Sequence, residues 1–304
     1  MTRTLVFMLL CLCLYHFATA QPDTNPFSET EQAFLKEMED TLGVLSYAVI
    51  HDSVPEYRFG ACRELITKLV KTLKTPNSFQ YPFSRLQSVS IQYPQDSSFR
   101  IFTWQLYVNE NEYRYYGAIQ MNAPELELYP LLDRSFELKG KENTQLTPEE
   151  WYGVVYYNIV QTDGPEGRYY VLFGFDAYEF YRKRKVIDVL TFEKGQPRFG
   201  APVFVEGGER KTNRIIREYS SEVSTRCNYD ESLGLIIFDH FIVMDGPYGE
   251  GPVNYPDGSY EAYELKNGLW AHIEKVFNET QEEAPRPNPI LDNRPKDILG
   301  REKN

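Results

Sequence analysis

Two aspartates could do chemistry, and each lies within an apolar run, KVIDVLTF at 185–192 and LIIFDHFIV at 235–243. Glycosidases use a pair of carboxyl groups about 5–10 Å apart across a groove. Asp188 and Asp239 are therefore the candidate catalytic residues of a carboxylate-dependent hydrolase. The competing interpretation is structural, because a carboxylate buried in a sheet is costly unless it is neutralised or paired with a cation.

The residue after Asp239 is a histidine, and an adjacent acid and base suggest a catalytic dyad. Successive side chains of a β-strand, however, point to opposite faces of the sheet. Asp239 shares one face with Ile237, and His240 shares the other face with Phe238. Unless a bulge interrupts this alternation, Asp239 and His240 cannot act together, and we do not interpret them as a dyad.

Asp188 shares its strand face with apolar residues such as Leu190. Two arginines occupy equally apolar strand faces, Arg100 in FRIFTWQLYV and Arg217 in RIIREYS. Because buried charges are normally paired, we predict a structural ion pair between Asp188 and an arginine, with Arg100 as the first choice and Arg217 as the second. The alternative is a functional carboxylate in a cleft.

The sequence motifs of other enzyme and cofactor-binding classes are absent. The sequence contains no G-x-S-x-G elbow, H-E-x-x-H helix, Walker loop, dinucleotide fingerprint or redox C-x-x-C. After the N-terminal leader the histidines are His51, His240 and His272, and a multi-histidine site would need nearly all of them. Asp257 belongs to a predicted Pro-Asp-Gly turn, and one loop aspartate is far from the several oxygens that calcium needs. We predict no metal and no cofactor.

The elements that position these groups fall into two regions. A capping box at 28–31 and a proline at 55 predict two amphipathic helices between about 28 and 75. From 86 to 277, short β-rich runs alternate with connectors such as TDGPEG and KNG, which are too short for parallel crossovers. The sequence predicts an α+β fold, with the helical pair packed on a large, mostly antiparallel meander sheet that forms an open barrel or a sandwich.

The first twenty residues, MTRTLVFMLLCLCLYHFATA, have the basic start, apolar stretch and small-x-small end of a signal peptide. The apolar stretch is shorter than the roughly 20 residues that span a bilayer. We expect a periplasmic or secreted protein that is mature from Gln21 and has no transmembrane segment. Residues 21–280 are predicted to form a single globular domain, and 281–304 a flexible, proline-rich tail.

The chain is acidic, with a formal net charge of −12. A protein of this charge repels nucleic acid, so we exclude nucleic-acid partners. Cys62 and Cys227 are the cysteines that remain after the leader. In an oxidising compartment they can form a disulfide. We favour the other interpretation, in which both are small, buried, apolar residues in separate elements.

Several motifs taken together resemble those of a family of exported proteins from Bacteroidota. They are KVIDVLTF, FGAPVF, RIIREYS, IIFDHF and PDGSY followed by NGLW. The resemblance runs over most of residues 85–277 and implies export and a shared fold. It brings no known activity, cofactor or catalytic residue to this chain.

Aromatic residues are the remaining signal, with 23 Tyr, 19 Phe and 3 Trp in groups such as YRYY, VVYYN and RYYV. Most aromatic rings in a β-rich protein fill its core, but exposed rings are platforms for sugars or protein partners. We therefore expect a non-catalytic exported protein that binds a ligand or an envelope partner. The alternative is a carboxylate-dependent hydrolase acting on glycans.

Overall fold

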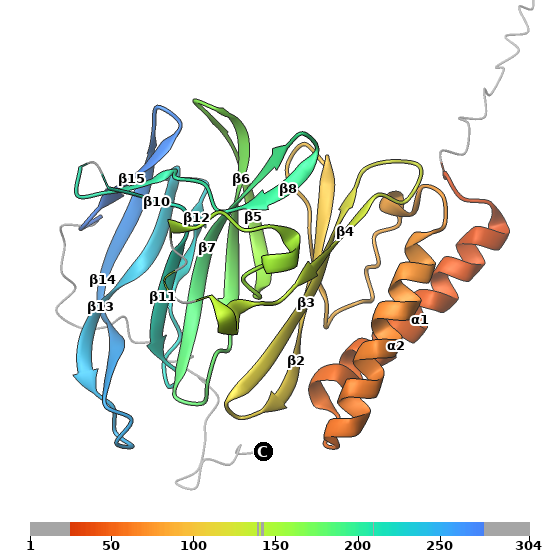
Figure 1. The fold of residues 1–304 in the computed structure, drawn as a ribbon, viewed down its shortest axis with the longest axis horizontal. Coiled ribbons are helices and arrows are strands. Elements are labelled where there is room, and N and C mark those ends of the chain that lie inside the picture. Colours follow the sequence, from red (N-terminus) through yellow and green to blue (C-terminus); the bar gives the residue numbers. More distant parts are fainter. Residues whose placement is uncertain (1–24, 139, 141–142, 209, 277–304) are drawn as a thin grey trace, which may run out of the picture.

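Two helices and three stacked sheets make up the protein in the computed structural model, which describes residues 25–138, 140, 143–208 and 210–276 (Figure 1). The helices are α1 (Glu29–His51) and α2 (Pro55–Leu73). The predicted α+β class is confirmed, and the described strands form no closed barrel. The predicted leader, cleavage site and C-terminal tail lie outside the described residues.

The strands follow the helices in one long β-rich region. Their bounds are β1 (Ser90–Gln92), β2 (Phe99–Asn109), β3 (Glu112–Met121), β4 (Leu128–Leu132), β5 (Val155–Gly164), β6 (Gly167–Asp176), β7 (Arg182–Glu193), β8 (Gln196–Phe199), β9 (Phe204–Glu206), β10 (Arg210–Thr212), β11 (Ile215–Ser220), β12 (Cys227–Asp230), β13 (Leu235–Asp245), β14 (Pro252–Lys266) and β15 (Leu269–Ile273).

Local signals set the helix starts. The Ser28 side chain accepts the Glu31 N–H, and the Glu31 carboxylate accepts the Ser28 N–H, so the predicted capping box is present. Pro55 occupies the first turn of α2, where its missing N–H costs nothing. The apolar stripes of both helices pack against β2, on residues such as Phe102 and Trp104.

The sheets have the orders β1-β2-β3-β4, β11-β7-β6-β5 and β10-β9-β15-β14-β13-β12, and β8 pairs with β7. Pairing is antiparallel throughout the described strands except between β15 and β9. Figure 1 shows the resulting four layers, with the helices at one end and the β13–β14 sheet at the other.

The middle sheet is buried on both faces, which explains its nearly continuous apolar runs. In β6, Tyr170 and Leu172 point into the core shared with β2 and β3. Val171 and Phe173 point into the core shared with β13 and β14. Asp188 lies in β7 of this sheet, so its surroundings are apolar whichever way its side chain points.

The Pro-Asp-Gly segment, for which the sequence predicted a turn, lies within β14 and not between two strands. It forms a bulge within β14, where the register shifts from Asp239–Tyr260 to Phe241–Pro256. Gly258 has φ +87°, which glycine adopts without strain. The bulge aims Asp257 at a neighbouring strand.

Candidate functional site

Asp188 is paired with Arg214. Arg214 Nε lies 3.0 Å from Asp188 Oδ2, and both side chains are 0% exposed. The Val189 N–H donates to Asp188 Oδ1 at 2.8 Å. Ile215 of β11 lies opposite Ile187 of β7, and one further step in this register places Arg214 opposite Asp188. A carboxylate sealed in this way cannot reach a substrate.

The predicted pairing of Asp188 with Arg100 is wrong, because Arg100 points into a different core. Its guanidinium donates to Gln120 Oε1, to the carbonyls of Ser78 and Tyr81, and to the Tyr93 hydroxyl, at 2.7–2.9 Å. These acceptors belong to β3 and to the chain beneath the helices. Arg100 is therefore held by neutral oxygens between the helices and the first sheet.

The second choice, Arg217, is wrong for a related reason. It lies three residues after Arg214, so the two side chains leave β11 on opposite faces. Arg217 points toward the third sheet, where its Nη2 lies 3.1 Å from Glu261 Oε1. The motif RIIREYS contains both arginines, and the register of β7 with β11 decides which one meets Asp188.

Asp239 and His240 do not form a dyad, in agreement with the strand alternation. Asp239 is 8% exposed, and its Oδ2 accepts the Arg226 N–H at 2.6 Å. Burial raises the pKa of Asp239, and this hydrogen bond opposes the shift. The His240 side chain is 40% exposed and contacts Asp257 instead.

The bulge in β14 supplies this partner. His240 Nδ1 lies 2.9 Å from Asp257 Oδ2. Asp257 Oδ1 accepts the N–H and the hydroxyl of Ser259 at 2.9 and 2.7 Å. Burial opposes ionisation of Asp257, but the bonds from Ser259 and His240 hold its pKa below the usual value. Sequence reasoning missed the contact because it depends on the bulge.

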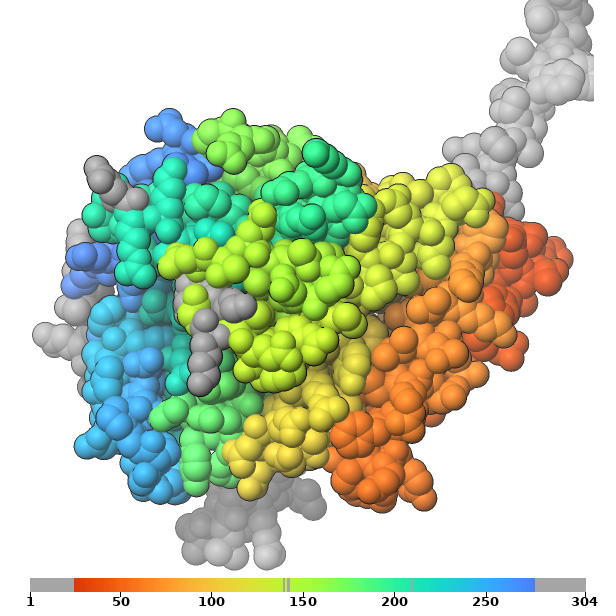
Figure 2. Space-filling view, in the orientation of Figure 1, coloured from red at the N-terminus to blue at the C-terminus, as the bar shows by residue number. Residues whose placement is uncertain are grey.

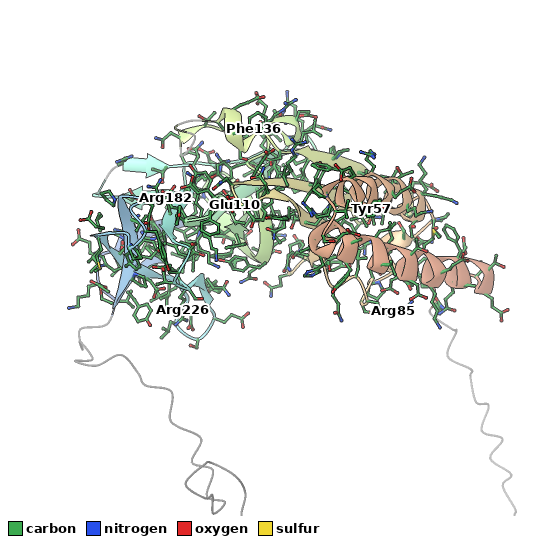
Figure 3. The ribbon with its side chains drawn as sticks, turned by 90° about the horizontal axis from the view of Figure 1, so that it is seen from below. Tyr57, Arg85, Glu110, Phe136, Arg182 and Arg226 are labelled. Carbon is green, nitrogen blue, oxygen red and sulfur yellow. The ribbon has the colours of Figure 1, made fainter. Side chains whose placement is uncertain are left out.

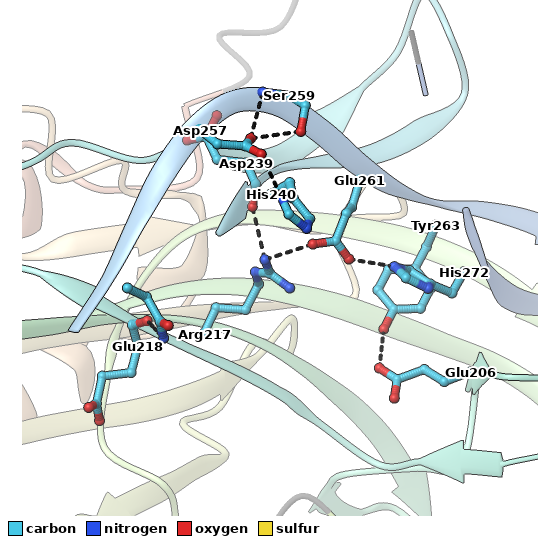
Figure 4. A network of polar contacts seen from close by, with 11 residues as sticks. Glu206, Arg217, Glu218, Asp239, His240, Asp257, Ser259, Glu261, Tyr263 and His272 are labelled. Carbon is cyan, nitrogen blue, oxygen red and sulfur yellow. Dashed lines mark hydrogen bonds and ion pairs between the residues drawn. The ribbon is translucent and has the colours of Figure 1, made fainter. Parts of the chain in front are cut away.

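A polar network lies beside this bulge and involves five strands, β9, β11, β13, β14 and β15 (Figure 4). Glu261 Oε2 lies 2.7 Å from His272 Nε2, and Glu261 Oε1 accepts from Arg217. Burial again opposes ionisation, but His272 and Arg217 lower the pKa of Glu261. The Tyr263 hydroxyl donates to Glu206 at 2.7 Å. These hydrogen bonds and ion pairs link β14 to β9, β11 and β15.

An open cavity of about 440 Å³ lies beside the network. It is lined by His240, Ser259, Glu261, Glu274 and Lys275. The residues that line it are polar or charged, and its central carboxylate, Glu261, is paired with Arg217 and His272.

A larger cleft forms where β3 extends beyond the end of β4. β4 pairs with β3 between Tyr116 and Gln120 only. The cleft has a volume of about 660 Å³, and it is lined by Glu112, Tyr113, Arg114, Tyr115, Tyr116, Leu131, Leu132, Asp133, Arg134, Ser135 and Phe136. Figure 3 shows Phe136 on the face opposite Arg85 and Arg226. In Figure 2 the segment that follows β4 covers the front of the sheets.

Asp133 shapes the wall of this cleft. Its Oδ2 accepts the Tyr115 N–H at 3.1 Å, and its Oδ1 accepts the N–H and the hydroxyl of Ser135 at 2.9 and 2.7 Å. Gly153 packs against the pair so closely that a Cβ there would overlap both Asp133 and Tyr115. Both carboxylate oxygens are engaged, so Asp133 holds the wall in place.

The surface of the cleft combines apolar groups with paired charges. Phe136 is 73% exposed at its rim, and Leu132 is also exposed. Arg114 lies 3.1 Å from Glu112, and Arg134 lies 3.3 Å from Glu137. The sequence signal for this site was the aromatic group YRYY at 113–116, which could not show that β4 stops short.

A buried carboxyl lies behind the cleft. The Tyr115 hydroxyl donates to Asp176 Oδ1 at 2.9 Å, and the Tyr178 N–H donates to the same oxygen at 2.8 Å. Tyr152 approaches the other oxygen at 3.4 Å. Burial raises the pKa of Asp176 to about 6, against these hydrogen bonds. Asp176 is 4% exposed and therefore supports Tyr115 without contacting a ligand.

Cys62 and Cys227 are free thiols. Cys62 lies in the core under the helices, and Cys227 lies in the core between the second and third sheets. Burial raises the pKa of both thiols, that of Cys227 to about 11. The disulfide that the sequence allowed is not formed.

Within the described ranges no group of three or more His, Cys, Asp or Glu side chains is arranged to hold a metal ion. Neither α1 nor α2 has the length and apolar character needed to cross a membrane. No protein family model, curated protein or solved structure matches the chain. The resemblance to exported Bacteroidota proteins thus stays a prediction from the motifs.

Proposed function

We propose that the protein is an exported, non-catalytic binding protein, whose cleft beside β3 holds a ligand or a segment of an envelope partner. Ligand sites are concave and largely apolar, with a few placed polar groups. The observation that carries the proposal is the composition of the cleft. Tyr113, Leu132 and Phe136 provide apolar surface, and the ion pairs of Arg114 and Arg134 stand beside them.

The same lining argues for binding over turnover. Among the described residues it contains no histidine or cysteine that could act as a base or a nucleophile. The Ser135 hydroxyl donates to Asp133, and Asp133 has both oxygens engaged. Glu112 is paired with Arg114. These groups can orient a ligand, and none is poised to transfer a proton.

The alternative, a carboxylate-dependent hydrolase acting on glycans, has weaker support. Of its two candidate acids, Asp188 is sealed with Arg214, and Asp239 accepts a main-chain N–H in a largely buried position. A glycosidase needs both carboxyls at one groove, and Asp188 faces none.

Ligand-observed NMR with a panel of neutral oligosaccharides, acidic oligosaccharides and synthetic peptides tests the proposal. We expect a panel member to bind the wild type, and to bind Phe136→Ala about tenfold more weakly, which corresponds to about 1.4 kcal/mol. Val44→Ala is the matched control, because Val44 is 72% exposed on α1 and does not line the cleft. Equal binding by Phe136→Ala and wild type, or conversion of the ligand to products, contradicts the proposal.

A further inference from the structure

The outer half of β13 has an open edge. β12 pairs with β13 from Leu235 to Phe238, and the Asp239 N–H donates to the Arg226 carbonyl at 3.3 Å. Beyond this point, residues 241–245 pair with β14 on one side, and no strand of the described chain pairs with them on the other. The β13–β14 hairpin projects at the lower left of Figure 1, at the end of the molecule away from the helices.

The register shows which backbone groups face this edge. The Asp239 N–H points toward β12, and backbone groups alternate in direction along an antiparallel strand. The N–H and C=O groups of Phe241, Val243 and Asp245 therefore point outward. The backbone groups of the even-numbered residues point toward β14. At the end of the hairpin this is confirmed by the Gly246 N–H, which donates to the Gly251 carbonyl.

The two edges of the hairpin carry different residues. Pro252 and Pro256 lie opposite Asp245 and Phe241, and Asn254 lies opposite Val243, so two of the three positions that would donate from the outer edge of β14 have no N–H. Proline on an edge blocks the addition of a strand. The open edge of β13 has no proline, and the side chains of Ile242, Val243 and Met244 are exposed, with Val243 at 68%.

We propose that residues 241–245 of β13 form a docking edge for one extended segment of a partner protein, which adds as a further strand. Main-chain hydrogen bonds from three outward-facing residues would hold the segment, and its alternate side chains would pack beside Ile242 and Met244, which share one face of β13. Asp245 is the charged residue of this edge, and the protein is acidic overall. The segment is therefore apolar at alternate positions and basic at its ends.

A second copy of this chain fits the edge less well. In a symmetric antiparallel pair centred on Val243, the hairpin tip of each copy, residues 246–251, would extend along β13 of the other copy as far as Asp239. Arg226 already bonds to Asp239 on that side of β13, so the tip would collide with it. A single extended segment brings no neighbouring strand, so it avoids this collision.

The docking edge lies in the third sheet, whereas the cleft lies beside the first. Occupation of the edge does not depend on Phe136, so the two proposals can fail separately. The probe is a synthetic heptapeptide with valine at alternate positions and lysine at both ends. Its fully N-methylated version keeps the side chains but cannot donate backbone hydrogen bonds.

Amide hydrogen exchange read by NMR on the full chain is the test. We expect the amides of Phe241, Val243 and Asp245 to exchange at least about tenfold more slowly with the heptapeptide, and to be unaffected by the N-methylated version. Val243→Pro should abolish the protection. Val243→Thr should retain it, because it keeps the N–H, and both variants should have wild-type melting temperatures, since this N–H has no partner in the described chain.

Absence of protection with the heptapeptide overturns the proposal. Protection that survives in Val243→Pro also overturns it, because side chains rather than strand pairing would then hold the peptide. Protection that grows with protein concentration when no peptide is present overturns it in favour of a second copy.

Discussion

Replacing Asp188 with asparagine should destabilise the fold by about 3–5 kcal/mol, the usual cost of breaking a buried ion pair from one side. The side chains of Asp188 and Arg214 are both 0% exposed, so water cannot replace the lost charge. Burial raises the pKa of Asp188 and Arg214 opposes the shift. A guanidinium stays protonated in proteins, and at 3.0 Å the Arg214 guanidinium favours the ionised form of the carboxyl. Asparagine would leave that guanidinium buried without a counter-charge.

Urea unfolding at pH 7 measures this change, provided that the dependence of the unfolding free energy on urea is the same in both proteins. Glu137→Gln is the matched control, because it breaks the exposed pair with Arg134 and should cost at most about 1 kcal/mol. The double variant Asp188→Leu/Arg214→Met should recover most of the loss, since apolar residues can replace a buried pair. A loss below about 1 kcal/mol in Asp188→Asn refutes the reasoning and returns Asp188 to the candidate functional residues.

Three further outcomes follow from the geometry. Burial raises the folded-state pKa of Asp176 from 3.8 to about 6, so between these pH values the folded state binds a proton that the unfolded state does not. This contribution to the unfolding free energy is complete below pH 4 and falls by about 3 kcal/mol as the pH rises to 6. Urea unfolding of Asp176→Asn should not show this dependence on pH. Gly153→Ala should lower stability by about 1–3 kcal/mol, because its Cβ overlaps Asp133; an unchanged melting temperature would contradict the close packing. In the folded protein Cys62 and Cys227 should resist a thiol reagent that labels both in urea, and rapid labelling of the native chain would show that these cores open.

The helices could be predicted because their signals are local. The capping box at Ser28 and the proline at 55 act on their own first turns, and short connectors were enough to predict antiparallel pairing. The partner of Asp188 could not be predicted in the same way. It depends on how β11 aligns with β7, and a choice between Arg214 and Arg217 reverses the face of the strand.

The candidate sites depend even more on pairing between strands. The cleft exists because β4 ends opposite Tyr116 while β3 continues to Glu112. The contact between His240 and Asp257 exists because β14 contains an extra loop of chain at Gly258. Neither the length of a strand nor a bulge leaves a periodic signal in the sequence, so the composition led us to expect an aromatic binding surface but could not predict its location.

A chemical-shift map of backbone amides, recorded with the tightest ligand of the panel, tests the central claim most directly. If the cleft is the binding site, the largest shifts will cluster at 112–116 and 131–136, and the ligand will be recovered unchanged. Shifts centred on His240 and Glu261, or cleavage of the ligand during the measurement, would contradict the account.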